Sequence, residues 1–178
     1  MNYKHRLEDT MILSLATKDD LVQLNTMYNE IIKDMSVNGL NIWDDIYPMI
    51  CFESDIENNN LYVLKDNNII VSAFSLCNTN QGEDYIKWEN KLAKSIYLDR
   101  LGINVNYKRK GIGTLTLNYA IEIAKERGYE YLRLFVVEQN LPALSLYKKS
   151  KFTICKGTYT EIIDENISFK ELGLEIKV

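Results

Sequence analysis

Residues 108–114 read Lys-Arg-Lys-Gly-Ile-Gly-Thr, three cations followed by two closely spaced glycines. The run lies between an apolar, β-prone stretch at 95–105 and a helix-like pattern at 114–127. Glycines let a ligand approach the main chain closely, and a helix N-terminus favours negative charge. The sequence therefore predicts an anion site whose backbone amides hold a pyrophosphate. A tight strand-to-helix turn with solvated lysines is the alternative for so short a pattern.

Two familiar phosphate loops compete for this segment. A Walker loop needs a Gly-Lys-Ser/Thr continuation, which does not follow Gly111. A dinucleotide fingerprint needs glycine at its sixth position, where this chain has Thr116, although Glu138 could imitate the acid that binds the ribose. The Walker loop is therefore excluded, and a dinucleotide-dependent oxidoreductase stays open as a remote alternative.

The patterns around the loop predict a mixed α/β fold of the α+β kind. Strand patterns occupy residues 11–15, 61–64, 69–77, 95–105, 131–137, 152 onward through 158 and 162, and 167–178. Helix patterns run from 17 to 39, from 114 to 127 and from 142 onward, and residues 41–52 fit either a helical turn or a loop. We expect a mixed central sheet of about six or seven strands, flanked by about four helices.

The composition is that of one compact domain. The 178 residues are 46% apolar and 26% charged, which fits a single domain over residues 1–178. The polar N-terminus lacks the pattern of a secretory signal, and no apolar run reaches the roughly 20 residues of a membrane span. We therefore expect a cytoplasmic protein without a membrane partner.

Several chemistries are disfavoured by residue counts. His5, in the polar leader, is the only histidine, so neither a Ser-His-Asp triad nor a histidine-rich metal site is expected. Cys51, Cys77 and Cys155 lack metal-ligand spacing. The net charge of −4, without a basic stripe, argues against nucleic acid. The sequence thus predicts no metal and no nucleic-acid partner.

Residues 96–152 resemble the core of the GNAT superfamily of acetyl-CoA-dependent N-acetyltransferases. The family's cofactor loop, Arg/Gln-x-x-Gly-x-Gly/Ala, is matched by residues 108–113, with lysine in the first place. A second family motif, Asn-x-x-Ala-x-x-Leu-Tyr, is matched by residues 140–147, and in the Gly-Phe that follows, Lys151 replaces the glycine. Two spaced motifs in the right order are far more specific than either one alone.

The resemblance implies the GNAT fold, with two parallel strands splayed apart at the cofactor cleft. It also implies that an amine acceptor attacks the thioester of acetyl-CoA directly in a ternary complex, with CoA as product and with Tyr147 protonating the departing thiolate. Asn140 would hydrogen-bond the pantetheine arm, with helix capping as its alternative role. The cofactor-binding residues so implied are Leu101, Ile103, Lys108, Arg109, Lys110, Gly111, Ile112, Gly113, Thr114, Asn140 and Ala143.

The general base is sought among nearby carboxylates, because an ammonium must lose a proton before it attacks. Strand alternation along 95–103 places Asp99 on the same face as Tyr97. Some relatives carry a catalytic glutamate at the position that Tyr97 occupies here. Asp99 is a candidate base, and Glu83 and Asp84 are the others. A solvated surface carboxylate is the alternative for each.

The acceptor site is predicted in two segments, 41–52 and 81–91, where aromatic and acidic residues occur together. Aromatic faces beside carboxylates suit an amine that arrives as a cation, so we predict acceptor contacts for Trp43, Tyr47, Tyr85 and Trp88. Burial as core anchors is the alternative. The partner would be a small-molecule amine or a peptide amino group, and we also consider a homodimer. A catalytically silent module that binds CoA on a GNAT fold is the rival function.

Overall fold

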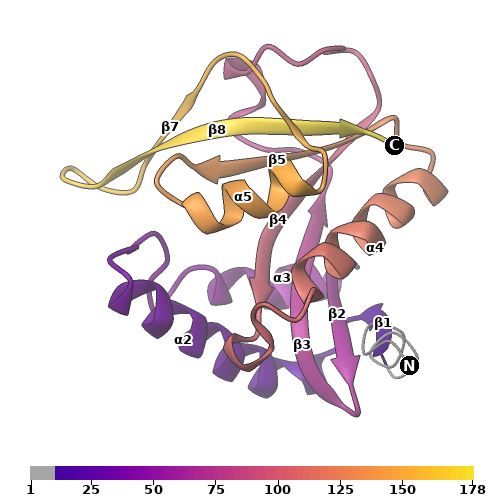
Figure 1. Cartoon of the computed structure of the whole chain (residues 1–178), viewed down its shortest axis with the longest axis vertical. Coiled ribbons are helices and arrows are strands. Elements are labelled where there is room, and N and C mark those ends of the chain that lie inside the picture. The colour runs from indigo at the N-terminus through magenta and orange to yellow at the C-terminus, as the bar shows by residue number, and fades with distance from the viewer. Residues whose placement is uncertain (1–10) are drawn as a thin grey trace. The chain divides into compact units, whose positions relative to one another are not determined.

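A computed structural model describes residues 11–178 of the chain (Figure 1). The chain divides into two compact units, one formed by residues up to Ser75 together with Arg100–Thr116, the other by Leu76–Asp99 together with Leu117–Val178. The single domain expected from length stays a prediction. His5 and the rest of the leader lie outside the described residues.

The described elements alternate along the chain in the order that the sequence patterns indicate. The strands are β1 (Met11–Leu15), β2 (Leu61–Asp66), β3 (Ile69–Cys77), β4 (Ser95–Ile103), β5 (Tyr131–Val137), β6 (Thr153–Ile154), β7 (Tyr159–Ile162) and β8 (Ser168–Lys177). The α-helices are α2 (Leu21–Val37), α3 (Phe52–Glu57), α4 (Ile112–Glu126) and α5 (Leu141–Lys149). Short 3₁₀ turns lie at η1 (Lys18–Asp20), η2 (Met49–Cys51), η3 (Glu83–Tyr85) and η4 (Val105–Tyr107).

The strands pair in the order β1-β2-β3-β4-β5-β8-β6, with β7 also paired to β8, which confirms the predicted mixed sheet. There are eight strands rather than the predicted six or seven. The strand pattern from 152 onward is broken at Gly157, which has a φ of 99° and where an added Cβ would clash with the carbonyl oxygen of Tyr85, so the position suits only glycine. β4 and β5 run parallel, and their pairing stops at Leu98 and Leu134 although both strands continue.

In the first unit, α2 packs on the hairpin of β2 and β3 through one buried stripe. Leu24, Tyr28 and Ile31 lie in the core, as their helical spacing predicts. Thr17 and Asp20 form a capping box before the helix. The hairpin turns at Asn67 and Asn68, both at positive φ, so β2 extends two residues beyond the predicted end at residue 64.

Two predicted boundaries near the cofactor loop were wrong. β4 ends at Ile103 rather than at Val105, because Asn104 turns the chain: its side chain accepts a hydrogen bond from the backbone of Asn106 at 3.0 Å and starts η4. α4 begins at Ile112, two residues before the predicted start. The glycine at position 113 therefore lies inside the first helical turn.

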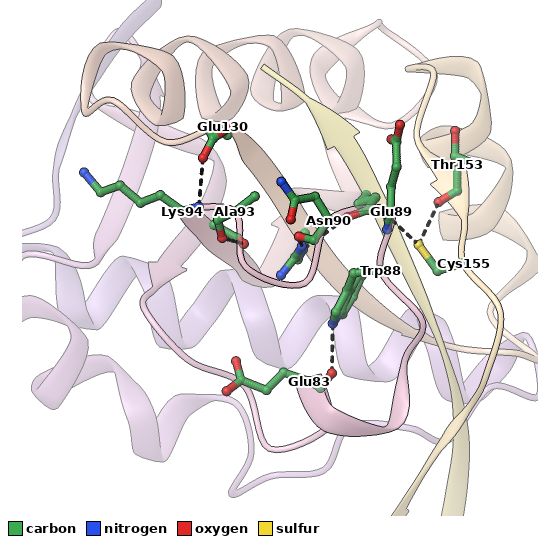
Figure 2. A network of polar contacts seen from close by, with 12 residues as sticks. Glu83, Trp88, Glu89, Asn90, Ala93, Lys94, Glu130, Thr153 and Cys155 are labelled. Carbon is green, nitrogen blue, oxygen red and sulfur yellow. Dashed lines mark hydrogen bonds and ion pairs between the residues drawn. The ribbon is translucent and has the colours of Figure 1, made fainter.

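In the second unit, residues 81–91 form a connection anchored by partly buried hydrogen bonds (Figure 2). The indole nitrogen of Trp88 donates to the carbonyl of Glu83 at 2.8 Å. The backbone N–H of Glu89 donates to Glu175 at 2.7 Å, and Arg133 donates to the carbonyl of Asn90 at 2.7 Å. These bonds fix a segment that carries no regular secondary structure beyond η3 and a single bridge from Lys87 to Lys156.

No helix within residues 11–178 has the length and apolar character that crossing a membrane requires.

Candidate functional site

The predicted anion loop connects η4 to α4 in the first unit, and its backbone is bent by residues at positive φ. Arg109 and Gly111 have φ of 60° and 86°. The first backbone N–H groups of α4, from Ile112 onward, have no acceptor inside the helix. The loop thus ends in a cluster of backbone donors at the positive end of the helix dipole, which suits an anion.

The side chains of the loop are partly engaged by their own neighbours. Lys108 forms an ion pair with Asp34 of α2. The ammonium of Lys110 lies 4.7 Å from the ring centroid of Tyr107. The backbone amides are therefore better placed than these two ammonium groups to supply the main contacts to an anion.

The segment Leu101–Ile103 lies at the end of β4 and is positioned by buried contacts in the same unit. Arg100 has a φ of 53°, and its guanidinium binds both carboxylate oxygens of Asp55, at 2.8 and 3.0 Å. The hydroxyl of Ser75 donates to the same carboxylate at 2.7 Å. Nothing in the sequence singles out Arg100, Asp55 and Ser75, because they are far apart in the chain and belong to no motif. Together they hold the bend that precedes Leu101.

The second predicted motif forms α5 in the other unit. The side chain of Asn140 accepts the backbone N–H of Ala143 at 3.2 Å, which is the capping alternative for this residue. Pro142 stands in the first turn, where its missing N–H is tolerated. A contact from Asn140 or Ala143 to pantetheine stays a prediction, and the side-chain amide N–H₂ of Asn140 is the donor it would use.

Tyr147 is buried, with 8% of its surface exposed, and its ring lies 5.9 Å from that of Phe152. No residue in the described part of the chain donates to or accepts from its hydroxyl. Burial, followed by the negative charge of Asp99, raises the pKa of the phenol above its usual value. The phenol therefore holds its proton at neutral pH, which a general acid requires.

The structure brings Asp99 close to two glutamates that sequence analysis missed, Glu161 on β7 and Glu171 on β8. Burial raises the pKa of Glu171 to about 8, with smaller contributions from the charges of Glu161 and Asp99. Burial, and then Asp99, also raises the pKa of Glu161. The two glutamates lie in the C-terminal hairpin of β7 and β8, outside both motifs, so only the strand pairing could reveal them.

The other candidate bases lie elsewhere in the second unit. Glu83 and Asp84 line a cavity of about 200 Å³ together with Trp88, Tyr97 and Arg133. Asp84 is also bound by Lys91 at 2.8 Å. Neither Asp99 nor Tyr147 is among the lining residues. The three predicted carboxylates therefore do not form one group.

The predicted acceptor aromatics differ in what covers them. Trp88 is 7% exposed, and the guanidinium of Arg133 lies 4.5 Å from its ring centroid, so its ring is already packed. Tyr85 is 62% exposed. In the first unit, Trp43 packs against Tyr28 at 5.6 Å and joins the core, whereas Tyr47 is partly exposed. Tyr85 and Tyr47 thus keep accessible ring surface for a ligand, and Trp88 serves mainly as an anchor.

Comparisons with known proteins agree with this architecture. The model of the acetyltransferase (GNAT) family matches residues 24–152. The Bacillus subtilis (strain 168) protein named "Putative phosphinothricin acetyltransferase YwnH" is 32% identical over 146 residues, covering 80% of this chain and 83% of that protein. The alignment with this relative thus spans most of both chains.

Solved structures show the same fold. A GNAT-family acetyltransferase from Streptococcus agalactiae 2603 superposes with a TM-score of 0.78 at 16% identity, over 94% of this chain and 95% of that one. Arabidopsis thaliana NAA60 in complex with acetyl-CoA has a TM-score of 0.68 at 16% identity, over 95% of this chain and 99% of that one. The resemblance inferred from the two motifs is confirmed: the chain belongs to the acetyltransferase (GNAT) family and is an N-acetyltransferase that uses acetyl-CoA.

Proposed function

We propose that the chain transfers the acetyl group of acetyl-CoA to a primary amine by direct attack in a ternary complex, with the pyrophosphate of the cofactor on residues 109–114. The observation that carries this proposal is the loop before α4. Positive φ at Arg109 and Gly111 turns the main chain into a helix whose first N–H groups lack partners. Leu101 and Ile103 would line the pantetheine arm.

Tyr147 is the proposed general acid. A thiolate leaving group has a pKa near 8.5, and a buried phenol still carries its proton at that pH. Its lack of a hydrogen-bonding partner among residues 11–178 leaves the hydroxyl available to a substrate. Packing against Phe152 holds the ring in place.

The acceptor is proposed to be a small molecule that carries an amine. The Bacillus subtilis relative is named for phosphinothricin, and this supports a small acceptor over a protein chain. Action in the cytoplasm and assembly as a homodimer remain part of the proposal.

The test measures the release of CoA thiol from acetyl-CoA in the presence of each amine of a panel, and identifies the acetylated product by mass. We expect release that requires both acetyl-CoA and an amine. Thermal protection of the protein by acetyl-CoA, and none by NADH, should accompany it, because a ligand that binds the native state raises the melting temperature. Protection by acetyl-CoA without turnover of any amine would favour the silent CoA-binding module.

A further inference from the structure

The C-terminal hairpin of the second unit gathers carboxylates on one face. β7 and β8 pair with Tyr159 opposite Glu171 and Glu161 opposite Phe169. Residues directly opposite each other, and residues two apart on one strand, share a face of the sheet, so Glu161 and Glu171 lie on the same face one diagonal step apart. Asp99 belongs to the same face, because Tyr97, two residues before it on β4, stacks on Phe135 at 6.3 Å, and Phe135 lies 6.2 Å from Tyr159. The raised pKa values of both glutamates, to which the charge of Asp99 contributes, agree with this placement.

These two glutamates lack countercharges of their own. Within residues 11–178, no lysine or arginine forms an ion pair with Glu161 or Glu171. Lys170, next to Glu171 in sequence, pairs with Glu138 at 3.0 Å. Both glutamates are partly buried. Partly buried carboxylates without a partner are costly, and a cation from outside the chain would offset that cost.

A second feature, independent of the hairpin, points to a ligand at the same place. Tyr147 lies on α5, and only 8% of its surface is exposed. Its hydroxyl has no hydrogen-bonding partner within the described residues. After burial, the charge of Asp99 contributes to the raised pKa of this phenol, as it does for the two glutamates. Tyr147, Glu161 and Glu171 therefore share Asp99 as a charged neighbour.

Aromatic rings border the carboxylates. Tyr159 lies directly opposite Glu171, with its ring centroid 5.3 Å from that of Tyr85 and 6.2 Å from that of Phe135. Tyr85 is largely exposed. Ring faces beside carboxylates favour a desolvated ammonium group over a neutral or anionic one.

We propose that Glu171, Glu161 and Asp99 bind the ammonium groups of the acceptor, that Glu171 takes the proton from the reacting amine, and that the preferred acceptor is a diamine or polyamine without an acidic group. This rests on the proposed acetyl transfer and names the substrate class and the base for it. Two ammonium groups suit three carboxylates, whereas an acceptor with its own carboxylate is repelled.

The protons and bonds balance without a further reactant. The positive charge of the bound ammonium groups favours the ionised form of Glu171. The Glu171 carboxylate then accepts a proton from the reacting ammonium and later releases it to solvent. The neutral amine forms a C–N bond to the acetyl carbonyl, and the C–S bond breaks as the tetrahedral intermediate collapses. Tyr147 gives its proton to the leaving thiolate and regains one from the nitrogen, which loses its second proton on forming the amide.

The test compares three acceptors that share a four-carbon amine: putrescine, butylamine and γ-aminobutyrate. Each is assayed by CoA thiol release with the wild type, with Glu171→Gln and with Glu165→Gln. Glu165 lies exposed in the turn between β7 and β8, so its variant makes the same charge change outside the carboxylate group. Wild type and Glu165→Gln should both prefer putrescine to butylamine and butylamine to γ-aminobutyrate.

For Glu171→Gln we expect kcat/KM for putrescine to fall at least ~10²-fold, the usual loss of a general base, with KM for acetyl-CoA unchanged. If Glu171→Gln acetylates putrescine as well as the wild type does, or γ-aminobutyrate matches putrescine, the inference is wrong while the acetyl transfer stands. If no amine in the wider panel is acetylated, the proposed function fails and this inference with it.

Discussion

The ring of Tyr28 lies directly on the backbone of Gly102. A methyl group added at Gly102 would lie 2.7 Å from the Tyr28 ring, and the Tyr28 hydroxyl donates to the carbonyl of Arg100. Tyr28 is fully buried on α2, and it also packs against Phe52 at 4.8 Å. One core side chain thus holds β4 in place at Gly102, between Leu101 and Ile103, the two residues proposed to line the pantetheine arm.

Gly102→Ala should destabilise the protein, because Tyr28 is held on all sides and cannot move away from the new methyl group. Overpacking of this kind costs about 1–3 kcal/mol. Chemical denaturation measures the loss. In the double variant Tyr28→Leu/Gly102→Ala, the ring atoms that the new methyl group would meet are gone, so the two changes should be non-additive. Full stability of Gly102→Ala alone would contradict the packing described.

Gly111→Asp tests the loop before α4. The change adds a negative charge beside the proposed pyrophosphate, so affinity for acetyl-CoA should fall by tenfold or more, or about 1.4 kcal/mol. Gly39→Asp is the matched control, since Gly39 also has a positive φ, of 75°, and open space around it. Both variants should lose similar stability, and calorimetry should show loss of acetyl-CoA affinity for Gly111→Asp only. Equal affinities in the two variants would refute the loop assignment.

Glu171→Gln should make the protein more stable at alkaline pH. The native pKa of Glu171 is raised to about 8 from an ordinary 4.5, so between these values the folded chain binds more protons than the unfolded one. Wild-type stability from this group therefore falls as pH rises through that window, and glutamine removes the effect. The melting temperature of the variant should exceed that of the wild type near pH 9 more than near pH 5. A constant difference would show that Glu171 is solvated.

Arg133 and Glu175 form the most buried ion pair among the described residues, at 3.1 Å. Arg133→Met would leave the Glu175 carboxylate without its cation, which costs about 3–5 kcal/mol for a buried pair. The double variant Arg133→Met/Glu175→Gln should recover part of that loss, because no buried charge remains. Denaturation curves of the three proteins form the cycle. A single variant as stable as the wild type would mean that water reaches the pair.

The sequence predicted the parts of the fold that depend on local patterns. β1, β5 and the helical stripe of α2 follow from spacing alone, and Asn140 and Pro142 mark the start of α5. The boundary errors arose where a side chain acts on the backbone a few residues away. Asn104 ends β4 by capping η4, which a hydrophobic pattern does not register.

The site was predictable only where it coincides with a motif. The loop and Tyr147 could be identified from residue spacing. Glu161 and Glu171 become neighbours of Asp99 only through the pairing of β7 with β8 and of β8 with β5, and such long-range register is not written in any local pattern. Likewise, Trp88 is predicted equally well as a ligand contact or an anchor until the position of Arg133 is known.

The central claim is most directly tested by single-turnover acetyl transfer in Tyr147→Phe, because single turnover isolates the chemical step from product release. Tyr129→Phe is the control, because the exposed hydroxyl of Tyr129 donates a hydrogen bond to the Asn78 side chain at 2.9 Å and belongs to neither motif. We predict that Tyr147→Phe binds acetyl-CoA as the wild type does but transfers the acetyl group about 10²–10⁴-fold more slowly, while Tyr129→Phe is unchanged. Transfer by Tyr147→Phe at the wild-type rate would contradict the claim.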